Sequence, residues 1–146
     1  MKKFALLLVA LATLAVLPAC SKAIKTEGVS GVVTYNGEPL ADANVKFIPS
    51  DSTGSQSVGK TNEKGEYKLQ TLLGAADAGT TPGEYKVTVD CVEPYETGNM
   101  IEENGTEIPE TKVRSVIPET YGRPETSGLT ATVVEGDNVI NFELTD

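Results

Sequence analysis

A glycine-rich loop and two cysteines are the features whose residue types could do chemistry. Residues 54–61 read Gly-Ser-Gln-Ser-Val-Gly-Lys-Thr, which fits the phosphate-binding loop pattern. In such a loop, backbone N–H groups wrap the phosphates and the Lys-Thr pair opens a helix. Residues 62–65 (Asn-Glu-Lys-Gly) turn the chain directly after the motif, so no helix can begin there. We interpret the match as a chance one in a Gly/Ser-rich surface loop.

Side chains suited to catalysis are otherwise scarce. The chain has no histidine, which excludes Ser-His-Asp and Cys-His hydrolytic sites and the commonest zinc sites. No pair of carboxylates stands at a strand end in an apolar setting that would raise a pKa. We therefore expect no enzyme activity, no catalytic residue and no cofactor.

Calcium needs only oxygen ligands, and acidic residues are frequent in the expected loops. None of them shows the one-three-five spacing of a calcium loop, which favours solvated acidic loops. A calcium or small-ligand site in the acidic region from Glu93 to Glu110 stays open as the alternative. The acidic loop residues are Asp51, Asp77, Glu102, Glu103, Glu107 and Asp137.

The first twenty residues have the layout of a secretory signal peptide. Lys2 and Lys3 form a short positive segment, residues 4–17 are an almost unbroken apolar run, and Leu-Pro-Ala-Cys follows at 17–20. The run is shorter than the roughly 20 apolar residues that a membrane-spanning helix needs. This pattern predicts a cleaved signal peptide over residues 1–19, with a retained membrane anchor helix or a buried core helix as the alternatives.

Residues 17–20 resemble the lipobox of bacterial lipoproteins, in which the signal peptide is removed before an acylated cysteine. The resemblance implies lipid attachment, including palmitate, at Cys20 and a lipidated tether over residues 20–27. Several acyl chains hold firmly, because each buried methylene contributes about 0.8 kcal/mol. Cleavage after Ala19, which would release a soluble protein, is the alternative.

The second cysteine, Cys91, has no internal disulfide partner if Cys20 is acylated. It lies in a strand-like stretch, which favours a buried inert thiol over a reactive thiol or one bridged to another molecule.

The net charge of the exported chain limits the classes of partner that it could bind. Removal of Lys2 and Lys3 with the signal leaves ten basic residues against 21 acidic ones, a net charge of −11. Such a chain is repelled by nucleic acid and by anionic lipid headgroups. We expect no nucleic-acid partner.

From Gly28 onward the sequence alternates in the manner of short β-strands, and no stretch shows a helical period. Asn36-Gly37, residues 62–65 and residues 135–137 are expected to make tight turns, the last two within hairpins. A long acidic stretch, residues 93–128, carries four prolines and only scattered apolar residues, and is expected to be an irregular insertion. Strands are expected over 29–35, 44–48, 58–61, 66–69, 83–92, 129–134 and 138–144. Within them, alternation predicts that one face carries the apolar residues: Val45 and Phe47; Tyr67 and Leu69; Tyr85, Val87, Val89 and Cys91; and Ile140, Phe142 and Leu144.

These segments resemble the carboxypeptidase regulatory-like domain. The resemblance rests on Val29 to Thr34, Asn36 to Val45, Thr61 to Tyr67 and Pro82 to Val89, and extends to about Leu144. It implies an all-β fold, a seven-stranded transthyretin-like (Ig-like) β-sandwich over residues 28–146, used as a non-catalytic accessory module. The related transthyretin-fold hydrolase uses histidines, which this chain lacks.

Together these observations favour a lipid-anchored module of the cell envelope, facing the periplasm or the exterior and binding an envelope protein or glycan. A periplasmic small-ligand or calcium-binding lipoprotein is the alternative.

Overall fold

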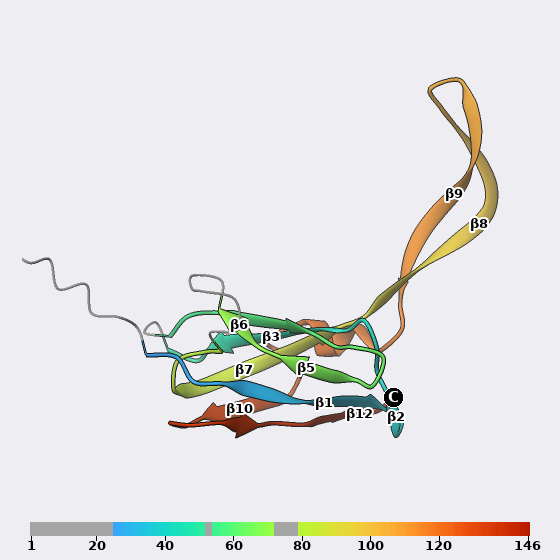
Figure 1. Cartoon of the computed structure of the whole chain (residues 1–146). Helices are drawn as coiled ribbons and strands as arrows, with labels where there is room; N and C mark the ends of the chain where they lie inside the picture. The colour runs from blue at the N-terminus through green and yellow to red at the C-terminus, as the bar shows by residue number, and fades with distance from the viewer. Residues whose placement is uncertain (1–24, 52–53, 72–78) are drawn as a thin grey trace, which may run out of the picture.

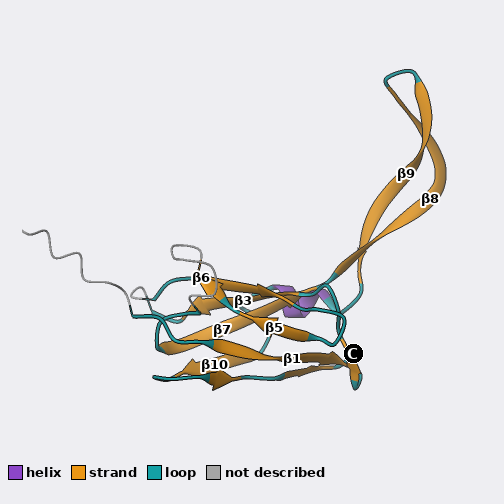
Figure 2. Ribbon diagram, in the orientation of Figure 1, coloured by secondary structure: helices purple, strands orange, loops and turns teal. Residues whose placement is uncertain are grey.

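A computed structural model describes residues 25–51, 54–71 and 79–146. The expected signal peptide and Cys20 lie outside these residues. Nearly all of the regular secondary structure in the described chain is β-strand, arranged as a sandwich of two sheets with one hairpin projecting from it (Figures 1 and 2). This agrees with the all-β sandwich expected from the alternating sequence.

The first sheet is organised around β1 (Val29–Tyr35). On one edge β1 pairs in parallel with β11 (Asn138–Val139) and β12 (Phe142–Leu144). On its other edge it pairs antiparallel with β2 (Glu38–Pro39) and β5 (Glu66–Lys68). The second sheet is antiparallel throughout, in the order β10 (Leu129–Val133), β7 (Gly83–Asp90), β3 (Asn44–Pro49), β4 (Ser57–Lys60) and β6 (Gln70–Thr71).

The core lies between the two sheets and is centred on four aromatic rings. Phe47 of β3 is fully buried, and its ring centroid lies 5.7 Å from Tyr85, 6.1 Å from Phe142 and 6.5 Å from Tyr67. Tyr67 and Phe142 come from the first sheet and Phe47 and Tyr85 from the second, so the rings tie the two layers together. The alternating positions Tyr85, Val87, Val89 and Cys91 are all buried, as the sequence predicted.

Close strand packing at Gly31 depends on the missing side chain. A Cβ built at Gly31 would come within 1.7 Å of the carbonyl oxygen of Ile140. That carbonyl also accepts a hydrogen bond of 2.7 Å from the Tyr67 hydroxyl. The Ile140 carbonyl therefore holds together β1, β5 and the segment between β11 and β12.

The two hairpins expected across residues 62–65 and 135–137 are not formed as predicted. Residues 66–68 pair with β1, while residues 70–71 pair with β4, so this strand passes from one sheet to the other. The strands on either side of residues 135–137 do not pair with each other: β10 joins β7, and β11 and β12 join β1. Alternation indicates which face of a strand is buried but does not select the neighbouring strand. The segments expected at 66–69 and 138–144 are interrupted where their pairing changes, which is one reason why the described residues contain twelve strands in place of the seven expected.

The largest difference from the sequence-based expectation is the acidic stretch. Residues 93–128 were expected to be irregular, yet β8 (Val92–Glu103) and β9 (Thr106–Ser115) form a long antiparallel hairpin, followed by a 3-10 helix (Glu119–Gly122). Asn104 and Gly105 close the hairpin with φ of 52° and 79°, as in the preferred two-residue hairpin turn. The Asn-Gly signal at 104–105 could have been recognised in the sequence. We call residues 92–115 the arm.

Candidate functional site

The glycine-rich motif is part of the sandwich and not a phosphate-binding loop. Residues 57–60 form β4, whose backbone pairs with β3. Ser57 is fully buried and donates a hydrogen bond to Thr80, while the Lys60 amine lies 2.7 Å from Asp42. Thr61 Oγ1 accepts a hydrogen bond from the Ala43 N–H. The described residues directly after the motif, 62–71, contain a turn and short strands and no helix, so the interpretation as a chance match is confirmed.

Cys91 is a buried thiol, as predicted. Its side chain is 4% exposed and its Sγ lies 3.5 Å from the Ala41 carbonyl oxygen. Burial raises the pKa of the Cys91 thiol, and the nearby carboxylates of Asp42 and Asp90 raise it further. A thiol with a raised pKa is a poor nucleophile.

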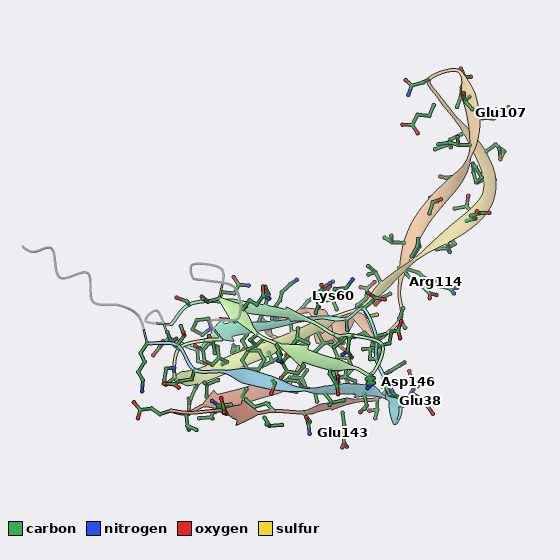
Figure 3. The ribbon with its side chains drawn as sticks, in the orientation of Figure 1. Glu38, Lys60, Glu107, Arg114, Glu143 and Asp146 are labelled. Atoms are coloured by element: carbon green, nitrogen blue, oxygen red, sulfur yellow. The ribbon has the colours of Figure 1, made fainter. Side chains whose placement is uncertain are left out.

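The acidic residues named as possible cation ligands do not gather. Within the described ranges, no three carboxylate or thiol side chains come together as a metal site. Glu102, Glu103 and Glu107 lie at the end of the arm, and Glu107 is labelled there in Figure 3. Asp137 follows β10 in the sandwich. Asp77 lies outside the described residues.

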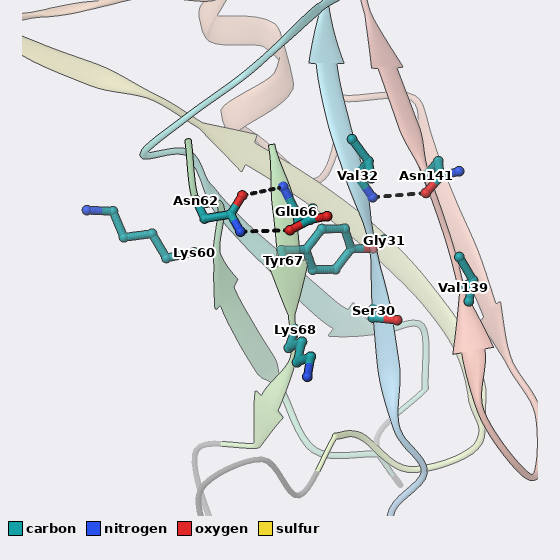
Figure 4. Close-up of a pocket in the computed structure, with 10 residues that line it drawn as sticks. All are labelled: Ser30, Gly31, Val32, Lys60, Asn62, Glu66, Tyr67, Lys68, Val139 and Asn141. Carbon is teal, nitrogen blue, oxygen red and sulfur yellow. Dashed lines mark hydrogen bonds between the residues drawn. The ribbon is translucent and has the colours of Figure 1, made fainter. Parts of the chain in front are cut away.

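An open groove of about 650 Å³ lies over β1, β5 and the β11–β12 segment (Figure 4). Much of its polar lining is already engaged within the fold. The side-chain oxygen of Asn62 (Oδ1) accepts hydrogen bonds from the backbone N–H groups of Lys64 and Glu66, and its side-chain amide nitrogen donates one to the Glu66 carboxylate. Asn141 likewise accepts from the backbone N–H of Val32. Tyr67 is only 2% exposed, so its ring offers no stacking surface to a ligand.

The arm is the other candidate, and the figures show it extending well away from the sandwich (Figures 1 and 3). Its two strands pair with each other and with no other described strand. A two-stranded ribbon is only marginally stable alone in water. The arm also carries five of the eight large apolar side chains that are exposed in the described chain: Val92, Tyr95, Met100, Ile101 and Val113.

The two faces of the arm differ in chemistry. Directly paired residues share a face, and successive residues alternate between faces. The register Pro94–Val113 and Met100–Pro109 therefore places an apolar stripe on one face. We call this the apolar face; its members are Val92, Pro94, Glu96, Met100, Glu102, Glu107, Pro109, Thr111, Val113 and Ser115.

The opposite face, called here the paired face, holds both cations of the arm. Arg114 forms a salt bridge of 2.5 Å with Glu93, and its guanidinium lies 5.8 Å from the centre of the Tyr95 ring. Lys112 lies 3.2 Å from Glu110. Ile101 and Ile108 pair near the tip, where Glu103 and Thr106 complete this face. Its charges are therefore largely compensated.

A β-bulge between Glu96 and Met100 is organised by one carboxylate. Glu110 accepts a hydrogen bond of 2.6 Å from the Thr97 hydroxyl and one of 3.1 Å from the Asn99 amide. These bonds, together with Lys112, lower the pKa of Glu110 to about 2. A bulge of this kind bends its strand and increases the local twist of the ribbon.

We expect the Glu110 carboxylate to stay ionised far below the ordinary pKa of 4.5, since its pKa is about 2 in the folded arm. Because the folded pKa is lowered, its stabilising contribution is present above pH 4.5 and is lost as the pH falls towards 2. An NMR titration that follows the side-chain carboxyl carbon of Glu110 measures this pKa. In Thr97→Val the pKa should rise towards 4.5; a wild-type titration near 4.5 would contradict the network.

Comparisons with known proteins identify no family for this chain. No family model matches the chain, and no curated protein matches it. The solved structures that resemble this chain include two weak matches. A candidate carbohydrate-binding protein from Pseudomonas aeruginosa has a TM-score of 0.41 at 11% identity, covering 88% of this chain and 93% of its own. A 9R-lipoxygenase from Cyanothece has a TM-score of 0.36 at 10% identity, covering 89% of this chain and 18% of its own. At these scores neither likeness bears on function.

Among the described residues, the structure contains no helix with the length and apolar character needed to cross a bilayer.

Proposed function

We propose that this protein is a non-catalytic binding module of the bacterial cell envelope, anchored by lipid at Cys20 and contacting an envelope partner through the arm. The arm carries the proposal: a long ribbon that leaves the sandwich with large apolar side chains facing water. Exposed apolar surface of this kind marks interaction sites. The same proposal includes the assignment to the carboxypeptidase regulatory-like domains and the transthyretin-like type of sandwich.

The arrangement of the two ends supports an anchored role. The described chain begins at one end of the sandwich, and the arm leaves from the other (Figure 1). A tether over residues 20–27 would therefore hold the sandwich at the membrane with the arm directed away from it. Such a geometry suits contact with a partner protein or glycan at a distance from the lipid surface.

Removal of the arm tests this function. Val92 and Ser115 are directly paired, so replacing residues 93–114 with Asn-Gly should close the base of the hairpin with a two-residue turn. Because the arm does not pair with the sandwich, we expect the melting temperature of the sandwich to change by less than about 4 °C. We expect chemical cross-linking to the envelope partner in intact cells to be lost.

Val139→Gln is the control, since Val139 is 74% exposed on the sandwich and distant in sequence from the arm. This variant should keep the cross-linked product. A variant that lacks the arm, remains folded and yields the same product would contradict the proposal.

A further inference from the structure

The distribution of charge on the arm identifies the chemistry of its partner, an inference that rests on the proposed function. The arm carries six carboxylates and two cations. Lys112 and Arg114, the two cations, both lie on the paired face, in salt bridges with Glu110 and Glu93. The apolar face therefore has carboxylates and no cation of its own.

The carboxylates of the apolar face are Glu96, Glu102 and Glu107. All three are exposed, and none has an ion pair or side-chain hydrogen bond among the residues that the structure describes. Glu102 and Glu107 are directly opposite each other, a like-charged pair that destabilises an isolated ribbon. Positively charged side chains of a binding partner would relieve the repulsion between these two carboxylates.

Apolar side chains lie between these carboxylates. Met100 is 55% exposed and Val113 is 68% exposed, and both share the face with Pro94 and Pro109. Burying such side chains removes apolar area from water, which contributes about 25 cal/mol per Å². The arm thus offers an apolar stripe bordered by unpaired negative charge.

We propose that the apolar face of the arm docks on a partner protein whose surface is apolar and bordered by lysine or arginine. Charge complementarity selects this occupant over a second copy of the chain. A second arm would bring the same three carboxylates to the interface, and the chain carries a formal net charge of −9. Nucleic acid and anionic lipid are repelled for the same reason.

Photo-cross-linking from the two faces tests the proposal in cells that produce the full chain. Thr111 and Lys112 are adjacent, exposed and on opposite faces, so each is replaced in turn by the photoreactive residue p-benzoylphenylalanine. We expect one discrete product from position 111 and little from position 112, with mass spectrometry identifying a protein cross-linked through a surface bearing Lys or Arg.

Affinity for the identified partner is then measured with purified full-length protein in detergent. Met100→Gln and Ile101→Gln are matched, since these neighbours are 55% and 44% exposed on opposite faces. We expect Met100→Gln to weaken binding about tenfold and Ile101→Gln to weaken it less than about threefold. Combining Glu96→Gln, Glu102→Gln and Glu107→Gln should remove most of the salt dependence of the association rate.

Several outcomes would overturn the inference. Cross-links from position 112 alone would leave the proposed function standing but assign binding to the paired face. A product of twice the chain mass would identify a second copy, and a glycan or an acidic protein at position 111 would remove the charge argument. Equal losses from Met100→Gln and Ile101→Gln would show that binding is not selective for a face. No product from either position would count against both this inference and the arm as the binding element.

Discussion

Phe47→Ala is expected to lower the free energy of unfolding by about 3–5 kcal/mol, the usual cost of truncating a buried aromatic ring. Phe47 is fully buried and packs against Tyr85 in its own sheet and against Tyr67 and Phe142 in the other. The loss would remove a large share of the stability of a small domain, which is about 5–15 kcal/mol. The cavity would open where the two sheets meet.

Urea unfolding followed by circular dichroism measures the effect. Tyr95→Ala is the matched control: it also removes an aromatic ring, but Tyr95 is 38% exposed on the arm. We expect the control to leave the unfolding midpoint of the sandwich almost unchanged. If Phe47→Ala does not fold, Phe47→Leu should give an intermediate loss. Equal stabilities of wild type and Phe47→Ala would mean that the ring cluster does not hold the sheets together.

Cys20→Ser is expected to move the protein from the membrane to the soluble fraction. A single acyl chain gives a membrane partition constant of only about 10⁴ M⁻¹, and several chains on one cysteine hold far more firmly. Under the proposed lipid anchoring, the substitution removes the thiol that would carry the acyl chains, and with it this whole contribution. Within residues 25–51, 54–71 and 79–146, no helix is long and apolar enough to cross a membrane.

The test needs a cleavable signal peptide that does not direct lipidation in place of residues 1–19, because an uncut apolar run over residues 4–17 could itself hold the chain at the membrane. Incorporation of labelled palmitate and membrane fractionation are the measurements. Cys91→Ser, which alters the buried thiol, should keep both the label and the membrane association. Palmitate incorporation into Cys20→Ser would place the lipid elsewhere.

The alternating pattern by itself determined the buried faces of the sandwich strands. Val45 and Phe47, Tyr67 and Leu69, and Phe142 and Leu144 are all buried as predicted, since a strand with one face against a core must alternate. Asn36-Gly37 also determined a turn, with φ of 50° and 85°. The absence of a phosphate-binding loop followed from the turn after Thr61. These features depend on residues close in sequence.

Only the tertiary structure decided which strands are neighbours and where the arm lies. The parallel pairing of β1 with β12 joins residues more than 100 positions apart, and no local pattern encodes such a choice. The arm escaped prediction because neither of its faces packs on the chain's own core, so its alternation shows no contrast between buried and exposed residues. Its apolar and paired faces, and the chemistry expected of a partner, emerge only once the register across the bulge is known.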